Sequence, residues 1–103
     1  MEFNLTDKAI AWFKDEFDLP QEGKAIHFIV RYGGAPQIKQ GFSPAFNIDS
    51  LANQPEEIAY ENNFDGVNII ITENDLWYYQ DIALTIDVDA QDEIVIKQNI
   101  EQE

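Results

Sequence analysis

The sequence has no cysteine, few basic residues and no long apolar run, and each absence excludes a class of protein. Without cysteine, the chain has no disulfide, no thiolate zinc site, no cysteine-ligated iron–sulfur cluster of its own and no thiol nucleophile. No apolar run approaches the roughly 20 residues that cross a bilayer. The opening segment 1–5 has neither the basic nor the apolar region of a secretory signal, so we expect a cytoplasmic protein.

Negative charge dominates the composition. Asp and Glu number 20 against 6 Lys and Arg, which gives a formal net charge of −14. Binding to nucleic acid or anionic lipid needs clustered basic residues that displace counterions, so we expect neither partner. At 103 residues, with 45% hydrophobic and 13% aromatic residues, the chain can still bury one core. We therefore predict a single folded domain over residues 1–103.

Local patterns predict one helix, one further helical turn and six short strands. Thr6 is a good helix N-cap, and apolar residues then recur at helical spacing until Pro20 and Gly23 turn the chain. A second helical turn is expected over 73–79, with Thr72 as its cap and Asp75 at the capping-box position. The expected strands are 25–32, 42–48, 58–61, 67–72, 82–88 and 93–98. The fold class is therefore α+β and β-rich.

Two strand regions carry more specific expectations. Pro44 cannot donate to a strand ladder, so residues 42–48 should form an edge or bulged strand. Residues 49–57 should form an exposed acidic loop, and residues 62–66, which contain Asp65-Gly66, should form a hairpin turn.

No catalytic, metal-binding or cofactor-binding motif is predicted. His27 is the only histidine and lies in the middle of an expected strand, where a partly exposed structural residue is the favoured interpretation. Residues 87–92 place carboxylates at alternate positions, as a calcium loop does, but Asp92 and Gln98 stand where that loop needs Gly and Glu. An acidic β-turn is the better interpretation, and no carboxylate pair is marked as an acid/base couple.

Two segments remain candidates for a binding site. Arg31 and Tyr32 lead into Gly33-Gly34, and Gly41 closes the loop, so the backbone at both ends could approach a ligand. The Arg31 guanidinium suits capture of a carboxylate or phosphate group. The second segment, 75–79, places several large side chains on one helical turn, so at least one should be near the surface. The candidate binding residues are Arg31, Tyr32, Gly33, Gly34, Gly41, Trp77 and Tyr78.

At Arg31-Tyr32-Gly33-Gly34 the sequence resembles the HesB-like family of A-type iron–sulfur carriers. The resemblance covers about residues 4–96 and is closest to a short, cysteine-poor bacterial branch, through blocks at 31–34, 41–43 and 75–78. It implies a fold of short mixed strands, as a two-sheet sandwich or pseudo-barrel, with one N-terminal helix. In that family the first cluster ligand follows the double glycine, but this position is Ala35 here, and the later Cys-Gly-Cys pair has no counterpart.

The resemblance therefore implies the fold without the sulfur-based cluster site. The favoured hypothesis is a non-enzymatic accessory or regulatory protein with no cofactor, which binds a protein or small anionic ligand through the loop 33–41. The first alternative is a direct role in iron or cluster assembly, with oxygen ligands or a partner's cysteines. The second alternative is a small enzyme with carboxylates that the sequence does not identify. The sequence leaves self-association open.

Overall fold

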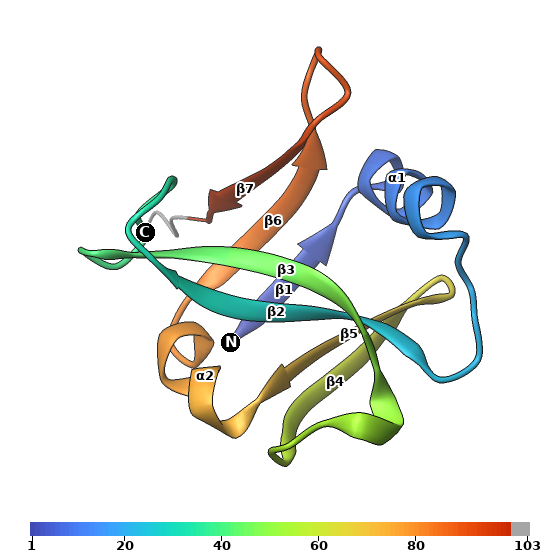
Figure 1. The fold of residues 1–103 in the computed structure, drawn as a ribbon. Coiled ribbons are helices and arrows are strands. Elements are labelled where there is room, and N and C mark those ends of the chain that lie inside the picture. Colours follow the sequence, from blue (N-terminus) through green and yellow to red (C-terminus); the bar gives the residue numbers. More distant parts are fainter. Residues whose placement is uncertain (100–103) are drawn as a thin grey trace.

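The computed structural model describes residues 1–99 and has two helices and seven strands (Figure 1). The strand-rich α+β class predicted from the sequence is confirmed. The elements in chain order are β1 (Glu2–Leu5), α1 (Asp7–Phe17), β2 (Lys24–Tyr32), β3 (Phe42–Ser50), the 3-10 turn η1 (Leu51–Asn53), β4 (Ile58–Phe64), β5 (Val67–Thr72), α2 (Glu73–Tyr79), β6 (Ala83–Val88) and β7 (Ile94–Gln98).

The strands form two mixed sheets. The four-stranded sheet has the order β3-β2-β5-β4, and the three-stranded sheet has the order β1-β6-β7. Each sheet contains one parallel pair, β2 with β5 and β1 with β6, among antiparallel neighbours. The helices α1 and α2 lie at opposite ends of the molecule (Figure 1). Because β3 and β7 each stand at the end of a strand order, they are edge strands, one in each sheet.

Strand β1 was not predicted, and it links the two sheets. It pairs in parallel with β6 on one side, and it places the buried Phe3 against the other sheet. The Phe3 ring centroid lies 5.1 Å from that of Phe28 and 5.6 Å from those of Tyr60 and Tyr79. A four-residue strand has too few residues for a recognisable period, and its partner lies about 80 residues away along the chain. Local patterns therefore could not identify it.

The helix α1 begins where the sequence predicts. The Thr6 hydroxyl accepts a hydrogen bond from the backbone N–H of Ala9 at 3.1 Å, which satisfies one of the free donors of the first turn. Ala9 and Phe13 are fully buried, so the apolar stripe of the helix packs onto the sheets. Its C-cap, Asp18, has a left-handed conformation with φ of 55°.

Three local expectations need correction. Strand β3 continues to Ser50 and is followed by η1, so residues 49–57 are not all loop. Strand β4 also runs further than expected, and only Asp65-Gly66 turns the chain, with positive φ at both residues as a tight hairpin requires. The capping box at α2 is absent, because Thr72 makes no side-chain cap and instead donates its hydroxyl to Glu56.

Candidate functional site

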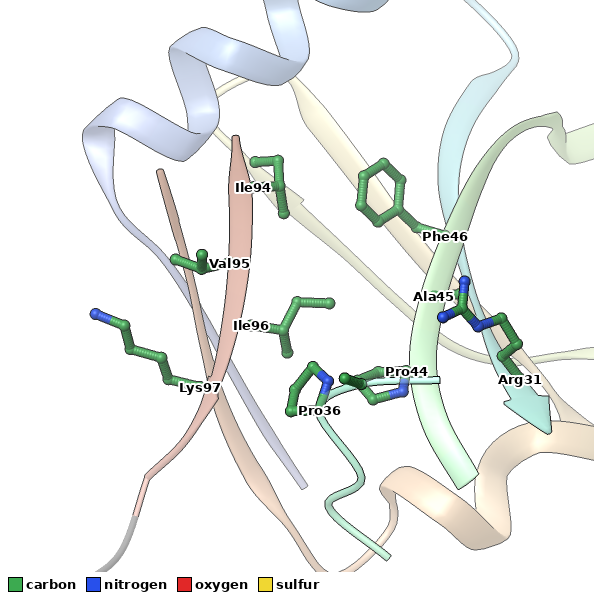
Figure 2. A pocket seen from close by; sticks show the side chains of 10 residues that line it. Arg31, Pro36, Pro44, Ala45, Phe46, Ile94, Val95, Ile96 and Lys97 are labelled. Carbon is green, nitrogen blue, oxygen red and sulfur yellow. The ribbon is translucent and has the colours of Figure 1, made fainter. Parts of the chain in front are cut away.

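An apolar groove of about 680 Å³ lies between the edge strands β3 and β7. The side chains of Phe46, Ile94 and Ile96 point into it from the two sides, and Pro36 enters from the preceding loop (Figure 2). Its volume falls within the range of small-ligand sites. The groove is lined by Arg31, Ala35, Pro36, Pro44, Ala45, Phe46, Ile94, Val95, Ile96 and Lys97.

The groove is bordered by the outer backbone edge of β7, which pairs with no other strand among residues 1–99. The backbone N–H of Asn99 donates to the backbone carbonyl of Ala83, and the backbone N–H of Asp89 donates to that of Glu93. These pairs fix the register, in which the hydrogen-bonded pairs of an antiparallel ladder alternate with non-bonded pairs. The backbone N–H and C=O groups of Ile94 and Ile96 must therefore point away from β6. No other residue within 1–99 occupies these groups.

Strand β3 presents the opposite border, and there Pro44 has a clear structural reason. The bond from Gly33 N–H to the Gly41 carbonyl, at 2.7 Å, fixes which residues of β3 face β2. By the same alternation, Pro44 and Phe46 turn their backbone outward. The N–H that proline lacks would have pointed into the groove rather than into the sheet. The predicted edge position of Pro44 is thus confirmed, and this border of the groove has one donor fewer.

The loop 33–41 closes one end of the groove and is braced by its own hydrogen bonds. Gly33, Gly34 and Gly41 all have positive φ, between 72° and 90°, which glycine adopts at little cost. The Gln37 side chain donates to the Gly34 carbonyl and accepts from the Gly41 N–H, at 3.3 and 3.1 Å. The Ser43 hydroxyl donates to the Gly33 carbonyl at 2.7 Å. These hydrogen bonds therefore preorganise the loop for binding.

Two basic residues flank this groove. Arg31 is exposed, and its guanidinium lies against Gly34, where a β-carbon would be 2.6 Å from Nε and 2.7 Å from Cζ. Lys97 is exposed on β7, and its side chain lies on the side of that strand away from Phe46 (Figure 2). Neither forms an ion pair within residues 1–99. Arg31 and Lys97 thus place positive charge beside an apolar groove in a strongly acidic protein.

The aromatic candidates form a neighbouring surface. Tyr32 is 87% exposed and Trp77 is 48% exposed, and both pack edge-on against Phe42 with centroids 5.2 and 5.3 Å away. The Lys39 ammonium donates to the Trp77 carbonyl and to Asp81, at 3.0 and 2.8 Å, and lies 5.8 Å from the centre of the Trp77 ring. The hydrogen bond from Lys39 and its positive charge lower the pKa of the Asp81 carboxyl. Tyr32 and Trp77 lie outside the groove lining, so the predicted residues divide between two surfaces.

Tyr78 does not belong to either surface. It is fully buried, and its hydroxyl donates to the Phe42 carbonyl at 2.9 Å. Tyr78 is therefore not part of the exposed surface that the sequence analysis expected it to share with Trp77. A seven-residue helix that packs onto a sheet buries one side, so Tyr78 and Tyr79 face the core while Trp77 faces solvent.

His27 is buried, which corrects the expectation of partial exposure. It is only 9% exposed, its Nδ1 lies 3.1 Å from Asp49 Oδ2, and its Nε2 is buried without a partner in the described chain. Burial raises the pKa of the nearby Asp75 carboxyl, an effect that His27 opposes and Glu56 reinforces. No local sequence pattern predicts this cluster, since its members come from four separate segments. None of them lines the groove.

Two further properties concern metals and membranes. Within residues 1–99, no group of three His, Asp or Glu side chains is arranged to hold a metal ion. No helix in the same range has both the length and the apolar character needed to span a bilayer.

Comparison with known proteins places the chain among staphylococcal relatives. No family model matches the chain. An uncharacterized protein of Staphylococcus saprophyticus is 52% identical over 95 residues, which cover 91% of this chain and 95% of that protein. Uncharacterized proteins of Staphylococcus epidermidis and Staphylococcus haemolyticus are 48% and 47% identical, over 96% and 91% of this chain and 100% and 94% of their own lengths. Identity at this level over nearly the whole length of both chains means that the protein belongs to the same family as these staphylococcal proteins.

Proposed function

We propose that the protein is a non-enzymatic binding protein that holds a protein segment or small anionic ligand in the groove between β3 and β7. The observation that carries this proposal is the groove itself, whose apolar walls are flanked by Arg31 and Lys97. An exposed apolar surface of this kind is typical of an interaction site. The two cations favour an anionic partner over the many neutral ones that apolar walls alone would accept.

We further propose that this binding site derives from a HesB-like ancestor. The two mixed sheets and the N-terminal α1 are compatible with the fold that the resemblance implies. Ala35, which stands where that family has its first cysteine ligand, lines the groove. Under this proposal, the position that held a cluster ligand became part of an apolar binding surface.

Affinity capture with matched variants tests the proposed function. Ala35→Trp places a large side chain in the groove from an exposed loop position, whereas Gln91→Trp places the same side chain on the exposed turn between β6 and β7. Each immobilised protein is incubated with a staphylococcal lysate, and the bound proteins and small molecules are identified by mass spectrometry. We expect wild type and Gln91→Trp to retain the same partner and Ala35→Trp to lose it. Equal retention by all three proteins, with unchanged melting temperatures, contradicts a role for the groove.

A direct role in iron or cluster assembly is the alternative that the resemblance supports. Oxygen ligands are a weak basis for it, because residues 1–99 contain no suitable group of donors. Such a role would need a partner's cysteines. We therefore expect anaerobic incubation of the isolated protein with iron and sulfide to leave it without the visible absorbance of a cluster. Stoichiometric iron and acid-labile sulfide on the protein would contradict this expectation.

The enzyme alternative is favoured by one observation. The Asp75 carboxyl has a raised pKa and lies near His27 and Glu56, and perturbed carboxylates of this kind occur at catalytic sites. They also occur in structural clusters, and these residues do not reach the groove. Loss of any measured activity in Asp75→Asn, with the fold intact, would favour this alternative.

A further inference from the structure

We infer that the occupant of the groove is an extended peptide segment with alternating apolar and acidic side chains, which adds to the free edge of β7 as a further strand. This inference rests on the proposed binding function and specifies the chemistry of the partner. It uses three independent features: the direction of the backbone groups on β7, the two sides of that strand, and the sequence of the neighbouring β6.

The backbone of β7 is ready to pair with another strand. The N–H and C=O groups of Ile94 and Ile96 point away from β6, and no other residue within 1–99 occupies them. Unpaired edge groups are a template for strand addition, a common mode of peptide recognition. Strand β3, across the groove, offers no N–H at Pro44. A peptide in the groove therefore finds the more complete set of donors and acceptors on β7.

The two sides of β7 differ in character, and this difference specifies the side chains of the peptide. Ile94 and Ile96 point into the groove towards Phe46, whereas Val95 and Lys97 lie on the other side of the strand (Figure 2). Side chains opposite one another on paired strands share a face of the sheet. Alternate side chains of an added strand would therefore meet apolar walls, and those between them would lie on the face of Lys97.

Strand β6, which pairs with the other edge of β7, already has this alternation of apolar and polar side chains. Its inward residues Leu84 and Ile86 are fully buried, while Thr85 and Asp87 alternate with them and pair in register with Lys97 and Val95. The hydroxyl of Thr6, the Val88 N–H and the charges of the lysines at 97 and 8 together lower the pKa of the Asp87 carboxyl. The positive charge of Lys97 thus favours an ionised carboxylate on this face of β6, and it contributes less than the hydrogen bonds from Thr6 and Val88. We infer the same preference on the free edge.

The test uses a peptide with the sequence of residues 84–89, acetyl-Leu-Thr-Ile-Asp-Val-Asp-amide, carrying a fluorescent label. Binding is measured by fluorescence anisotropy, and amide hydrogen exchange of the isotopically labelled full-length protein is followed by NMR. We expect binding that protects the amides of Ile94 and Ile96, while those of Val95 and Lys97 stay protected with and without peptide. Two N-methylated peptides, blocked at alternate positions, serve as controls. The peptide methylated on the N–H groups that face away from β7 should bind like the parent. The peptide methylated on the N–H groups that face β7 should lose binding by at least tenfold.

Charge reversal tests the acidic part of the inference. Lys97→Glu should weaken peptide binding about fivefold at low salt, since exposed charge pairs contribute modestly. Lys24→Glu is the matched control, because it reverses an exposed lysine at the start of β2 that does not line the groove, and it should bind the peptide as wild type does. A peptide with Lys in place of both Asp residues should bind wild type more weakly than the parent.

Three outcomes would overturn the inference. Equal binding of both N-methylated peptides would mean that the groove takes side chains without strand pairing. Protection of the Ile94 and Ile96 amides in the free protein, together with a dimer in analytical ultracentrifugation, would mean that a second copy covers the edge. A parent peptide that fails to bind, while Ala35→Trp still loses its captured partner, would leave the proposed function standing and remove strand addition as its mode.

Discussion

The guanidinium of Arg31 lies directly against the backbone of Gly34, in space that a β-carbon at position 34 would fill. Such a carbon would be 2.6 Å from Nε and 2.7 Å from Cζ, closer than atoms that are not bonded can approach. The absence of a side chain at Gly34 therefore leaves the space in which this cation lies. Because Arg31 lines the groove, the glycine influences the charge of the site as well as the turn of the chain.

A pair of glycine substitutions separates these two effects. Gly33 and Gly34 have nearly equal φ values of 74° and 72°, but a β-carbon at Gly33 would meet nothing within 4 Å. Both Gly33→Ala and Gly34→Ala should therefore lower the free energy of unfolding by about 1 kcal/mol, the typical penalty for a left-handed alanine. Only Gly34→Ala should displace Arg31 and weaken binding of the peptide or captured partner. Denaturant titration and anisotropy measure the two quantities on the same samples.

Arg31→Ala provides the control for this interpretation. It removes the guanidinium and leaves the glycine backbone unchanged, so it should weaken binding as much as Gly34→Ala with a smaller effect on stability. Glu56→Ala and Gln91→Ala alter residues outside the groove and should bind as wild type does. If Gly33→Ala weakens binding as strongly as Gly34→Ala, the shape of the loop and not the place of Arg31 controls the site.

The buried tyrosines of α2 support a second prediction. The Tyr78 hydroxyl donates to the Phe42 carbonyl at 2.9 Å, and the Tyr79 hydroxyl donates to the Ile29 carbonyl at 2.6 Å. Burial raises the pKa of the Tyr79 phenol strongly, so it stays protonated as a donor. Tyr78→Phe and Tyr79→Phe should each lower the free energy of unfolding by about 1–2 kcal/mol. Binding in the groove should not change, and a parallel loss of affinity would assign Tyr78 a functional role after all.

Most of the fold could be predicted because its elements carry strong local patterns. Three patterns each predict an element from a dozen residues or fewer: the Thr6 cap, the spacing of apolar residues in α1 and the alternation in β6. The missed strand β1 depends instead on a parallel partner, β6, at the far end of the chain. The misread capping box failed for a similar reason, since a distant Glu56 accepts the hydrogen bond of the Thr72 hydroxyl.

The candidate site was predictable only on one of its sides. Arg31 and the glycine loop stand out in the sequence because cations and paired glycines are rare in this chain. The wall formed by Ile94 and Ile96 does not, because alternating apolar residues indicate a strand whether or not its edge is open. Which edge stays unpaired is decided by sheet order. His27 was misread as well, since its burial depends on segments that approach it from other parts of the chain.

The His27–Asp49 contact supports a third prediction. His27 is buried and its Nε2 has no partner within residues 1–99, whereas the Asp49 side chain is 45% exposed and can be hydrated alone. Asp49→Ala should therefore lower the free energy of unfolding by about 1–2 kcal/mol, because both ring nitrogens then lack a partner. His27→Leu removes the unsatisfied group and should change stability by less than about 1 kcal/mol. The double variant should match His27→Leu in urea titrations at pH 8, and additive losses would mean that Asp49 acts through other contacts.

The final prediction concerns pH and the junction between α1 and β6. The Thr6 hydroxyl accepts from the Ala9 N–H and donates to Asp87 Oδ1 at 2.8 Å, so one side chain joins the start of the helix to the strand. This bond and the Val88 N–H lower the pKa of the Asp87 carboxyl below its ordinary value of 3.8. Because the folded pKa is the lower one, the ionised carboxylate stabilises the fold above pH 3.8. That stabilisation is lost as the pH falls through the folded pKa.

Asp87→Asn keeps the shape of the side chain and removes its charge, so it should melt at a lower temperature than wild type at pH 7. The difference should shrink below pH 3.8 and vanish once Asp87 is protonated in the folded protein, because the two proteins then carry the same charge at this position. Thr6→Ala should lower the free energy of unfolding by about 1 kcal/mol through loss of the cap. Asp15→Asn alters an exposed carboxylate on α1 and is the matched control. If the difference between wild type and Asp87→Asn is constant from pH 7 to pH 2.5, the contact with Thr6 does not depend on charge.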